Sequence, residues 1–175
     1  VRDCIRQVGH EHSYTNNSHH PNTGHAKAWP STELWPNCRV QYVIKTVDNC
    51  NHAEFTSTQN CDGQEFSASD GLLASEHVAA AAQHISNMTL CSVNEVTLTT
   101  SSTWVNQNLL HIHDDVSNPP GCWASLGYNS QGDTEIGLGW CKDDIGTITH
   151  ELLHSFGMVH EQQRPDRTTY LNLGS

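Results

Sequence analysis

Basic residues and long apolar runs are both scarce in this chain of 175 residues. Eight Lys and Arg stand against 19 Asp and Glu, which gives a formal net charge of −11 with neutral histidines. A chain with so few cations is poorly suited to bind phosphate backbones or anionic lipid headgroups. No apolar run approaches the roughly 20 residues that cross a bilayer. We therefore expect neither nucleic acid nor a membrane as a partner.

No secretory leader is visible, and the chain opens at Val1 rather than at methionine, as expected of a processed or partial product. Cysteine, by contrast, is plentiful, with seven residues. Two Asn-x-Ser/Thr sequons begin at Asn16 and Asn87. Together these features predict a secreted, extracellular glycoprotein with disulfide bonds. Because seven is odd, one cysteine is left over.

The strongest motif is the run His150-Glu151-Leu152-Leu153-His154-Ser155-Phe156-Gly157-Met158-Val159-His160, which fits H-E-x-x-H-x-x-G-x-x-H. Residues four apart share one helix face, so His150 and His154 can direct two imidazoles at one metal. Gly157 ends the helix, because glycine enters left-handed conformations at little cost, and the turn brings His160 as a third ligand. Three histidines leave an open position for water, as in catalytic zinc sites.

The chain contains 13 histidines, so the frequency with which the motif would arise by chance must be estimated. The short H-E-x-x-H would arise in roughly one of twenty such chains, and the full pattern in roughly a few of ten thousand. The motif therefore predicts a zinc-dependent endopeptidase, in which Glu151 assists the attack of a zinc-bound water on the peptide bond. The alternative is a non-catalytic, zinc-containing extracellular binding or structural module derived from a protease. Glu151 favours the enzyme, since structural zinc needs no uncoordinated carboxylate beside it.

The sequence from His150 to Leu171 resembles the astacin family of metzincin proteases, which continue from the third histidine as H-E-x-x-R-x-D-R. Here Glu161, Arg164, Asp166 and Arg167 fill those places. Upstream, Gly121-Cys122-Trp123 and Cys141 are similar to the cysteine-bounded segment that leads into the astacin zinc helix.

The resemblance implies site residues one by one. His150, His154 and His160 would be the ligands of Zn2+, Glu151 would be the catalytic acid/base, and Cys122 and Cys141 would form a disulfide. A polypeptide substrate would pair in extended form with an edge strand near residues 122–126, in contact with Trp123 and Ser125.

Only fifteen residues follow His160, whereas the family places a methionine turn and a further tyrosine ligand well downstream. We therefore expect the C-terminal subdomain to be absent, with a C-terminal fragment or further chain completing the cleft. Among the other cysteines, Cys50 could form a local disulfide with Cys61, and Cys4 could pair with Cys38. These two pairings together would leave Cys91 over, although the sequence does not fix the connectivity. In the family, a cysteine at the place of Cys91 pairs near the C-terminus.

The expected fold class is α+β: a metzincin-type N-terminal subdomain with a twisted mixed β-sheet and two long helices, the second carrying the zinc motif. Residues 1–30 would form a His/Asn-rich extension, and residues 31–175 an astacin-like catalytic domain truncated after the third histidine. We expect strands near residues 40–47, 95–100, 109–113 and 135–138. A helix is expected over 70–88, and the zinc helix is expected to begin near Asp143 or Asp144. The first helix has an apolar stripe of Leu72, Leu73, Val78, Ala79, Ala82 and Ile85.

Other histidines allow further hypotheses. His111 and His113 alternate on one strand face beside Asp114, which fits a second metal site or, more plainly, a solvated polar face. The N-terminal histidines could bind metal weakly or block the active site. Cys4 could instead cap the zinc as an inhibitory thiolate.

Overall fold

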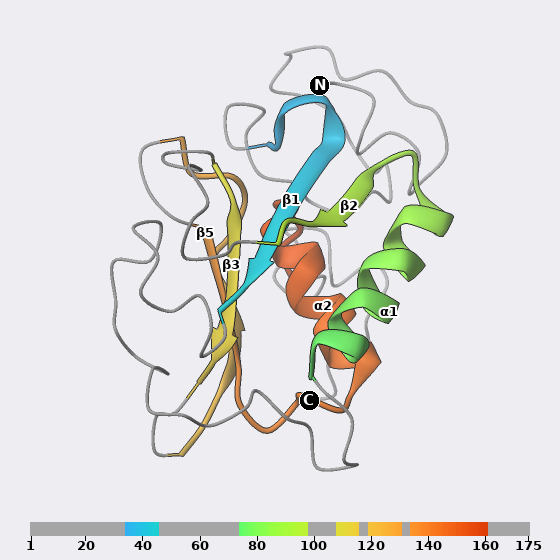
Figure 1. Ribbon diagram of the computed structural model, residues 1–175. Coiled ribbons are helices and arrows are strands. Elements are labelled where there is room, and N and C mark those ends of the chain that lie inside the picture. The colour runs from blue at the N-terminus through green and yellow to red at the C-terminus, as the bar shows by residue number, and fades with distance from the viewer. Residues whose placement is uncertain (1–33, 46–73, 98–107, 116–118, 131–133, 161–175) are drawn as a thin grey trace, which may run out of the picture.

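The computed structural model describes residues 34–45, 74–97, 108–115, 119–130 and 134–160, and the following account concerns these residues. They form two helices, a 3-10 turn and a five-stranded sheet (Figure 1). In chain order the elements are η2 (Pro36–Cys38), β1 (Arg39–Ile44), α1 (Ala74–Met88), β2 (Ser92–Glu95), β3 (Leu110–Asp114), β4 (Cys122–Ala124), β5 (Thr134–Leu138) and α2 (Ile145–Ser155). None of the helices described in these ranges is long and apolar enough to span a membrane.

The sheet is mixed, with strand order β2-β1-β3-β5-β4. Strand β1 runs parallel to β2 and β3, and β3 runs parallel to β5. Strand β4 is antiparallel to β5, with Trp123 opposite Gly137, and lies at the edge of the sheet that the structure describes. A mixed sheet with two helices confirms the predicted α+β class.

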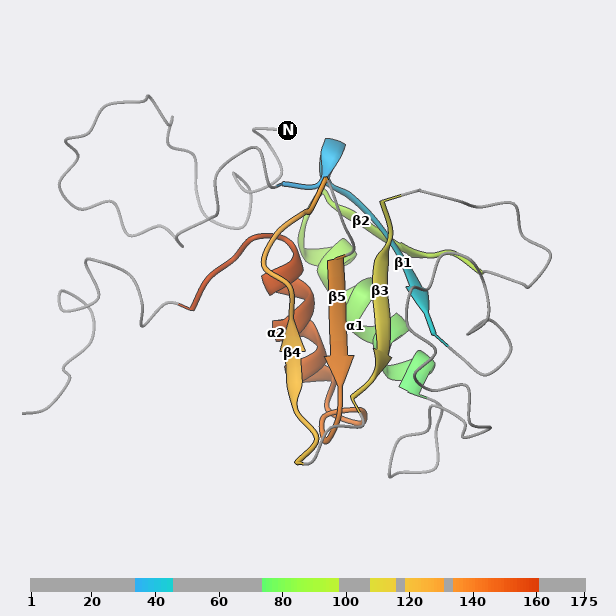
Figure 2. The same cartoon turned by 90° about the vertical axis from the view of Figure 1, so that its left-hand side faces the viewer.

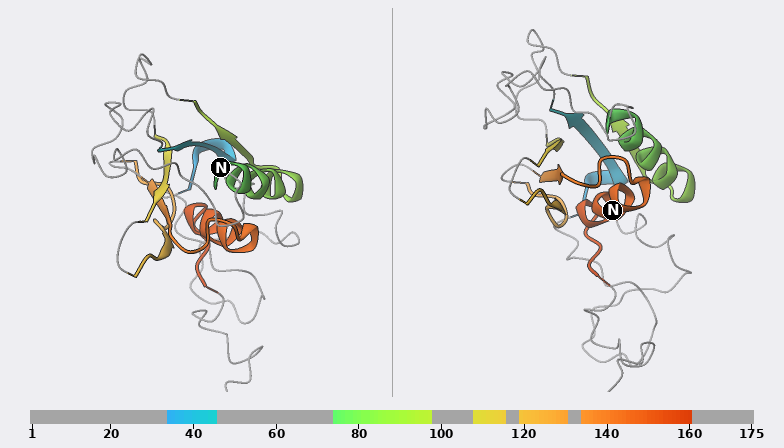
Figure 3. Two further views of the ribbon diagram at one scale, coloured as in Figure 1. Left: turned by 60° about the horizontal axis from the view of Figure 1, so that its bottom comes forward. Right: turned by 90° about the horizontal axis from the view of Figure 1, so that it is seen from below.

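Both helices pack against the same face of the sheet and against each other (Figure 2). The view from below shows this two-layer arrangement, with α2 beside the strands and α1 next to it (Figure 3). The core between the layers buries apolar side chains from every strand except the edge strand β4 and from both helices, among them Val78, Ile85, Leu110, Ile136 and Leu152. Burial of these side chains fixes the position of α2, the helix that carries the H-E-x-x-H motif.

Helix α1 confirms the predicted element, although its expected beginning at residues 70–73 lies outside the described residues. Val78, Ala82 and Ile85 are buried as expected. Ala79 is exposed, and Ala81 takes its place in the core. The prediction for Ala79 was wrong because apolar residues run without a break from 78 to 82, and such a run does not fix the helical phase.

Of the strand expected at 95–100, Glu95 lies in β2, residues 96–97 lie outside any strand, and residues 98–100 lie outside the described residues. Strand β2 ends at Glu95, because its pairing with β1 begins directly after the turn that follows α1, with Ser92 opposite Arg39. Its sequence Ser-Val-Asn-Glu buries only Val93, so the pattern gives little signal for an edge strand. The other three expected strands agree with β1, β3 and β5 to within three residues at each end.

Cysteine pairing departs from the sequence expectation. Cys38 forms a disulfide with Cys91, so it does not pair with Cys4, and Cys91 is not the leftover cysteine. The reason is strand register. Arg39 and Ser92 are partners across the parallel strands β1 and β2, and Cys38 and Cys91 directly precede them in the chain. The Cα atoms of the two cysteines are therefore only 4.8 Å apart. Cys4, Cys50 and Cys61 lie outside the described residues, as does the expected 1–30 extension.

Candidate metal centre

The zinc helix α2 begins where the sequence predicted. Asp144 is its N-cap: the carboxylate accepts from the backbone N–H of Gly146 at 2.9 Å and from the Thr147 hydroxyl at 2.6 Å. These bonds, led by that from Thr147, lower the pKa of Asp144. The cap fixes the start of the helix at Ile145, five residues before His150.

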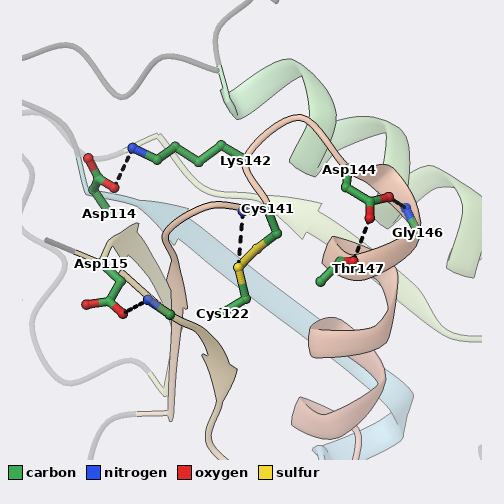
Figure 4. Close-up of a disulfide and its surroundings, with 9 residues drawn as sticks. Asp114, Asp115, Cys122, Cys141, Lys142, Asp144, Gly146 and Thr147 are labelled. Carbon is green, nitrogen blue, oxygen red and sulfur yellow. Dashed lines mark hydrogen bonds and ion pairs between the residues drawn. A yellow bond between two sulfur atoms is a disulfide. The ribbon is translucent and has the colours of Figure 1, made fainter. Parts of the chain in front are cut away.

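The segment leading into α2 is joined to the edge strand β4 by the Cys122–Cys141 disulfide (Figure 4). Polar contacts hold the same region. Lys142 Nζ lies 2.6 Å from a carboxylate oxygen of Asp114, and the Asp115 carboxylate accepts from the backbone N–H of Gly121 at 2.7 Å. Strand β4 and the start of the zinc helix are therefore held together.

Three histidine side chains converge at the far end of α2. The Nε2 atom of His160 lies 3.0 Å from that of His150 and 2.9 Å from that of His154. The candidate ligand atoms of this group all lie within 4.8 Å of one another. Nitrogens that bind one tetrahedral zinc at about 2.0–2.1 Å are about 3.3 Å apart, so this donor set fits the metal. Among the described residues, no other group of three His, Cys, Asp or Glu side chains could hold an ion.

The protonation states also suit metal binding. His154 Nδ1 lies 2.6 Å from the Met158 carbonyl oxygen, which can only accept, so Nδ1 carries the proton and Nε2 keeps its lone pair. Burial, followed by the neighbouring His154, lowers the pKa of His150. Burial and the neighbouring histidine thus favour the neutral imidazole of His150, which is the form that binds metals.

Glu151 follows His150 directly and is buried, with 6% of its surface exposed. Its negative charge raises the pKa of His150 and so acts against the larger lowering by burial. Glu151 is next to His150 in the chain and does not belong to the histidine cluster.

The turn after α2 brings the third histidine back to the first two. Gly157 has φ of 88°, a left-handed conformation that other residues adopt at a cost, and its N–H donates to the His154 carbonyl at 2.8 Å. The His154 carbonyl also accepts from the N–H of Gly127. Trp35 Nε1 donates to the Ser155 carbonyl at 2.8 Å. Trp35 and Gly127 could not be predicted from the sequence, since no local spacing links them to the motif.

The two expected substrate contacts lie on β4 and directly after it. Trp123 is 39% exposed and covers Gly137, where an added Cβ would be 2.5 Å from the indole Nε1. The backbone N–H of Ser125 donates to the Glu135 carbonyl at 2.8 Å, and its hydroxyl accepts from the Glu135 N–H. Because backbone groups alternate in direction along a strand, those of Cys122 and Ala124 face away from β5.

The histidines of β3 lie apart from this centre. His111 is 3% exposed on a strand between two others, so the expectation of a solvated face was wrong for this residue. His113 is half-buried and packs edge-on against the Trp123 ring at 5.5 Å. Among described residues the two histidines belong to no metal-capable group.

A mixed sheet, a helix carrying H-E-x-x-H and a third histidine delivered by a glycine turn define a metallopeptidase class of fold and site. The family model of the astacin peptidases matches residues 65–175, more than half of the chain. The chain belongs to the astacin family. This family consists of zinc-dependent proteases.

Individual relatives show the same likeness over a shorter stretch. The chain is 43% identical to meprin A subunit beta of Homo sapiens over 53 residues, which cover 30% of this chain and 8% of the relative. Blastula protease 10 of Paracentrotus lividus is also 43% identical over 53 residues, covering 30% and 9%. The matched stretch thus covers less than a tenth of the length of these relatives. The solved structure of myroilysin gives a TM-score of 0.45 at 20% identity, covering 77% of this chain and 55% of that chain.

Proposed function

We propose that this chain carries the zinc site of an endopeptidase that hydrolyses peptide bonds. The observation that carries the proposal is the convergence of three histidine Nε2 atoms at the end of a helix in which the buried Glu151 directly follows the first ligand. His150, His154 and His160 would hold the metal, and three protein ligands would leave a position for a water molecule. Bound zinc supplies a Lewis acid that polarises the scissile carbonyl and acidifies water.

Glu151 acts as the catalytic acid and base. Its carboxylate accepts a proton from the attacking water and returns it to the leaving amine, so that no covalent enzyme intermediate forms. Burial of Glu151 keeps the carboxylate in one position on α2, directly after a ligand. Correct placement of this acceptor contributes to the rate because proton transfer needs hydrogen-bond distance.

The polypeptide substrate binds as an added strand along β4. The outward backbone groups of Cys122 and Ala124 pair with it, and alternate substrate side chains meet the exposed Trp123 ring. The Ser125 hydroxyl, which already accepts one bond, can donate to a peptide carbonyl. The contacts between α2 and β4, and the Cys122–Cys141 bond, hold this edge beside the metal site. We also propose that a C-terminal fragment or a further chain completes the active-site cleft.

The compartment is proposed to be extracellular. Disulfides at Cys38–Cys91 and Cys122–Cys141 suit an oxidising environment. The sequon residue Asn87 is exposed at the end of α1 and is proposed to carry a glycan, which a mass shift on treatment with peptide N-glycosidase would detect.

The test is hydrolysis of a quenched fluorescent peptide library by the zinc-loaded protein and by Glu151→Gln at equal zinc content. Loss of the carboxylate is expected to reduce turnover at least about 100-fold, because general base catalysis contributes that much. Glu76→Gln, on the exposed face of α1, is the matched control and should cleave like the parent.

Two outcomes would contradict the proposal. Equal cleavage by the parent and Glu151→Gln would show that the Glu151 carboxylate takes no part in catalysis. Tight zinc binding without cleavage by either protein would favour the alternative, a binding or structural module that kept the metal ligands.

A further inference from the structure

The carbonyl groups at the end of α2 are hydrogen-bonded by distant parts of the chain. The last four carbonyls of a helix lack partners within it. In α2, those of Leu152 and Leu153 are satisfied by the backbone N–H groups of the following turn. The Ser155 carbonyl accepts from the Trp35 indole, a residue 120 positions earlier in the chain. The His154 carbonyl accepts from Gly127 at 3.0 Å in addition to the local Gly157.

Trp35 is itself held in place from two sides. Its side chain is 3% exposed, and its ring packs at 5.0 Å against the Tyr128 ring, next to Gly127. The turn that follows it is closed by a bond from the Cys38 N–H to the Trp35 carbonyl. The Cys38–Cys91 disulfide then ties this turn to the chain after α1. The indole N–H is therefore a fixed donor rather than a mobile contact.

The helix turn that Trp35 holds is the one that carries the second histidine of the triad. Ser155 follows His154 directly, and its carbonyl belongs to the last residue of α2. From this turn the chain reverses at Gly157, with the Met158 carbonyl 2.6 Å from His154 Nδ1, and continues to His160. A shift of the Ser155 carbonyl would move the position from which the reversal begins.

We propose that Trp35 is a positioning residue for the metal centre: its indole N–H, through the Ser155 carbonyl, fixes the turn that brings His160 to His150 and His154. The inference rests on the zinc site of the proposed function. It assigns a role in that site to a side chain outside the motif and on a different element. Tyr128 supports the indole, and Gly127 fixes the adjacent carbonyl in the same way.

The test compares the parent with Trp35→Phe, which keeps an aromatic ring in the core and removes the N–H. Zinc affinity is measured by competition with a chelator, and the geometry of the ligands by the visible absorption spectrum of the cobalt-substituted protein. Trp35→Phe is expected to weaken zinc binding about 10-fold, as loss of outer-shell partners does, and to change the cobalt spectrum. Val93→Ala, in β2 at the opposite edge of the sheet, is the control for general loss of stability.

The outcomes separate the inference from the site itself. A Trp35→Phe protein that melts at lower temperature but binds zinc and cobalt like the parent would overturn the inference and leave the site intact. A parent that binds no zinc would overturn the site, and the inference with it. If Trp35→Phe does not fold, Tyr128→Leu is tested instead. This variant keeps the indole N–H of Trp35 and removes only the aromatic ring that packs against the indole. This variant should weaken zinc binding to a smaller extent, and unchanged zinc affinity would again contradict the inference.

Discussion

The two disulfides should differ in their effects: Cys38–Cys91 should contribute more to stability, and Cys122–Cys141 should contribute more to the metal centre. Cys122 and Cys141 are 19 residues apart, and Cys38 and Cys91 are 53 apart. In the chain-entropy model, loops of these lengths correspond to about 3 and about 4 kcal/mol of stabilisation, respectively. Replacing Cys38 and Cys91 by serine should therefore lower the free energy of unfolding more. Replacing Cys122 and Cys141 should reduce peptide cleavage more, because that bond joins β4 to the segment entering the zinc helix.

Urea unfolding of the parent and the two double serine variants, followed by circular dichroism, gives the first quantity. The second is the peptide cleavage rate at saturating zinc, under conditions where the same unfolding curves show every variant to be essentially fully folded. An equal loss of cleavage in both variants would refute the particular role of the Cys122–Cys141 bond at the metal centre. A larger stability loss for the Cys122 and Cys141 variant would refute the entropy argument.

Three further predictions concern single residues. Gly157→Ala should cost about 1–2 kcal/mol because φ of 88° is unfavourable with a Cβ, and calorimetry with zinc titration should show weaker metal binding as well as a lower melting temperature. Asp144→Ala should lower the melting temperature at neutral pH. Since the pKa of Asp144 is lowered in the folded state, this difference should persist above the ordinary value of 3.8 and disappear as the carboxylate protonates below it. Burial, with the Glu95 charge, raises the pKa of Tyr42 from 10.0 to about 12, so stability should fall between these two values, where only the unfolded chain ionises. Denaturant unfolding measured across that pH range should show a free energy of unfolding that falls less steeply with pH for Tyr42→Phe than for the parent. Identical slopes in the two proteins would contradict the assignment.

The arrangement of the candidate metal site could be predicted where it depends on local geometry. His150 and His154 are one helical turn apart, and Gly157 ends the helix with the left-handed conformation expected from its type. The helix was expected to begin near Asp143 or Asp144 because acidic residues suit the helix dipole, and the structure places the N-cap at Asp144, whose partners are within three residues. Helical spacing and cap chemistry are local properties, so the sequence contains them directly.

Features that depend on the register of distant strands could not be obtained in this way. The Cys38–Cys91 bond follows from the pairing of Arg39 with Ser92 across β1 and β2, which no sequence pattern announces. The Trp35 contact with Ser155 likewise needs the packing of the chain before η2 against the end of α2. The burial of His111 depends on the position of β3 between β1 and β5 in the sheet order.

The most direct measurement of the central claim is the zinc stoichiometry of the purified chain and of three single variants, His150→Ala, His154→Ala and His160→Ala. The exposed His84 on α1, changed to Ala, is the control. We predict one zinc per chain in the parent and the control, and loss of tightly bound zinc in each of the three variants. A parent without zinc, or zinc that remains bound in all three variants, would contradict the account.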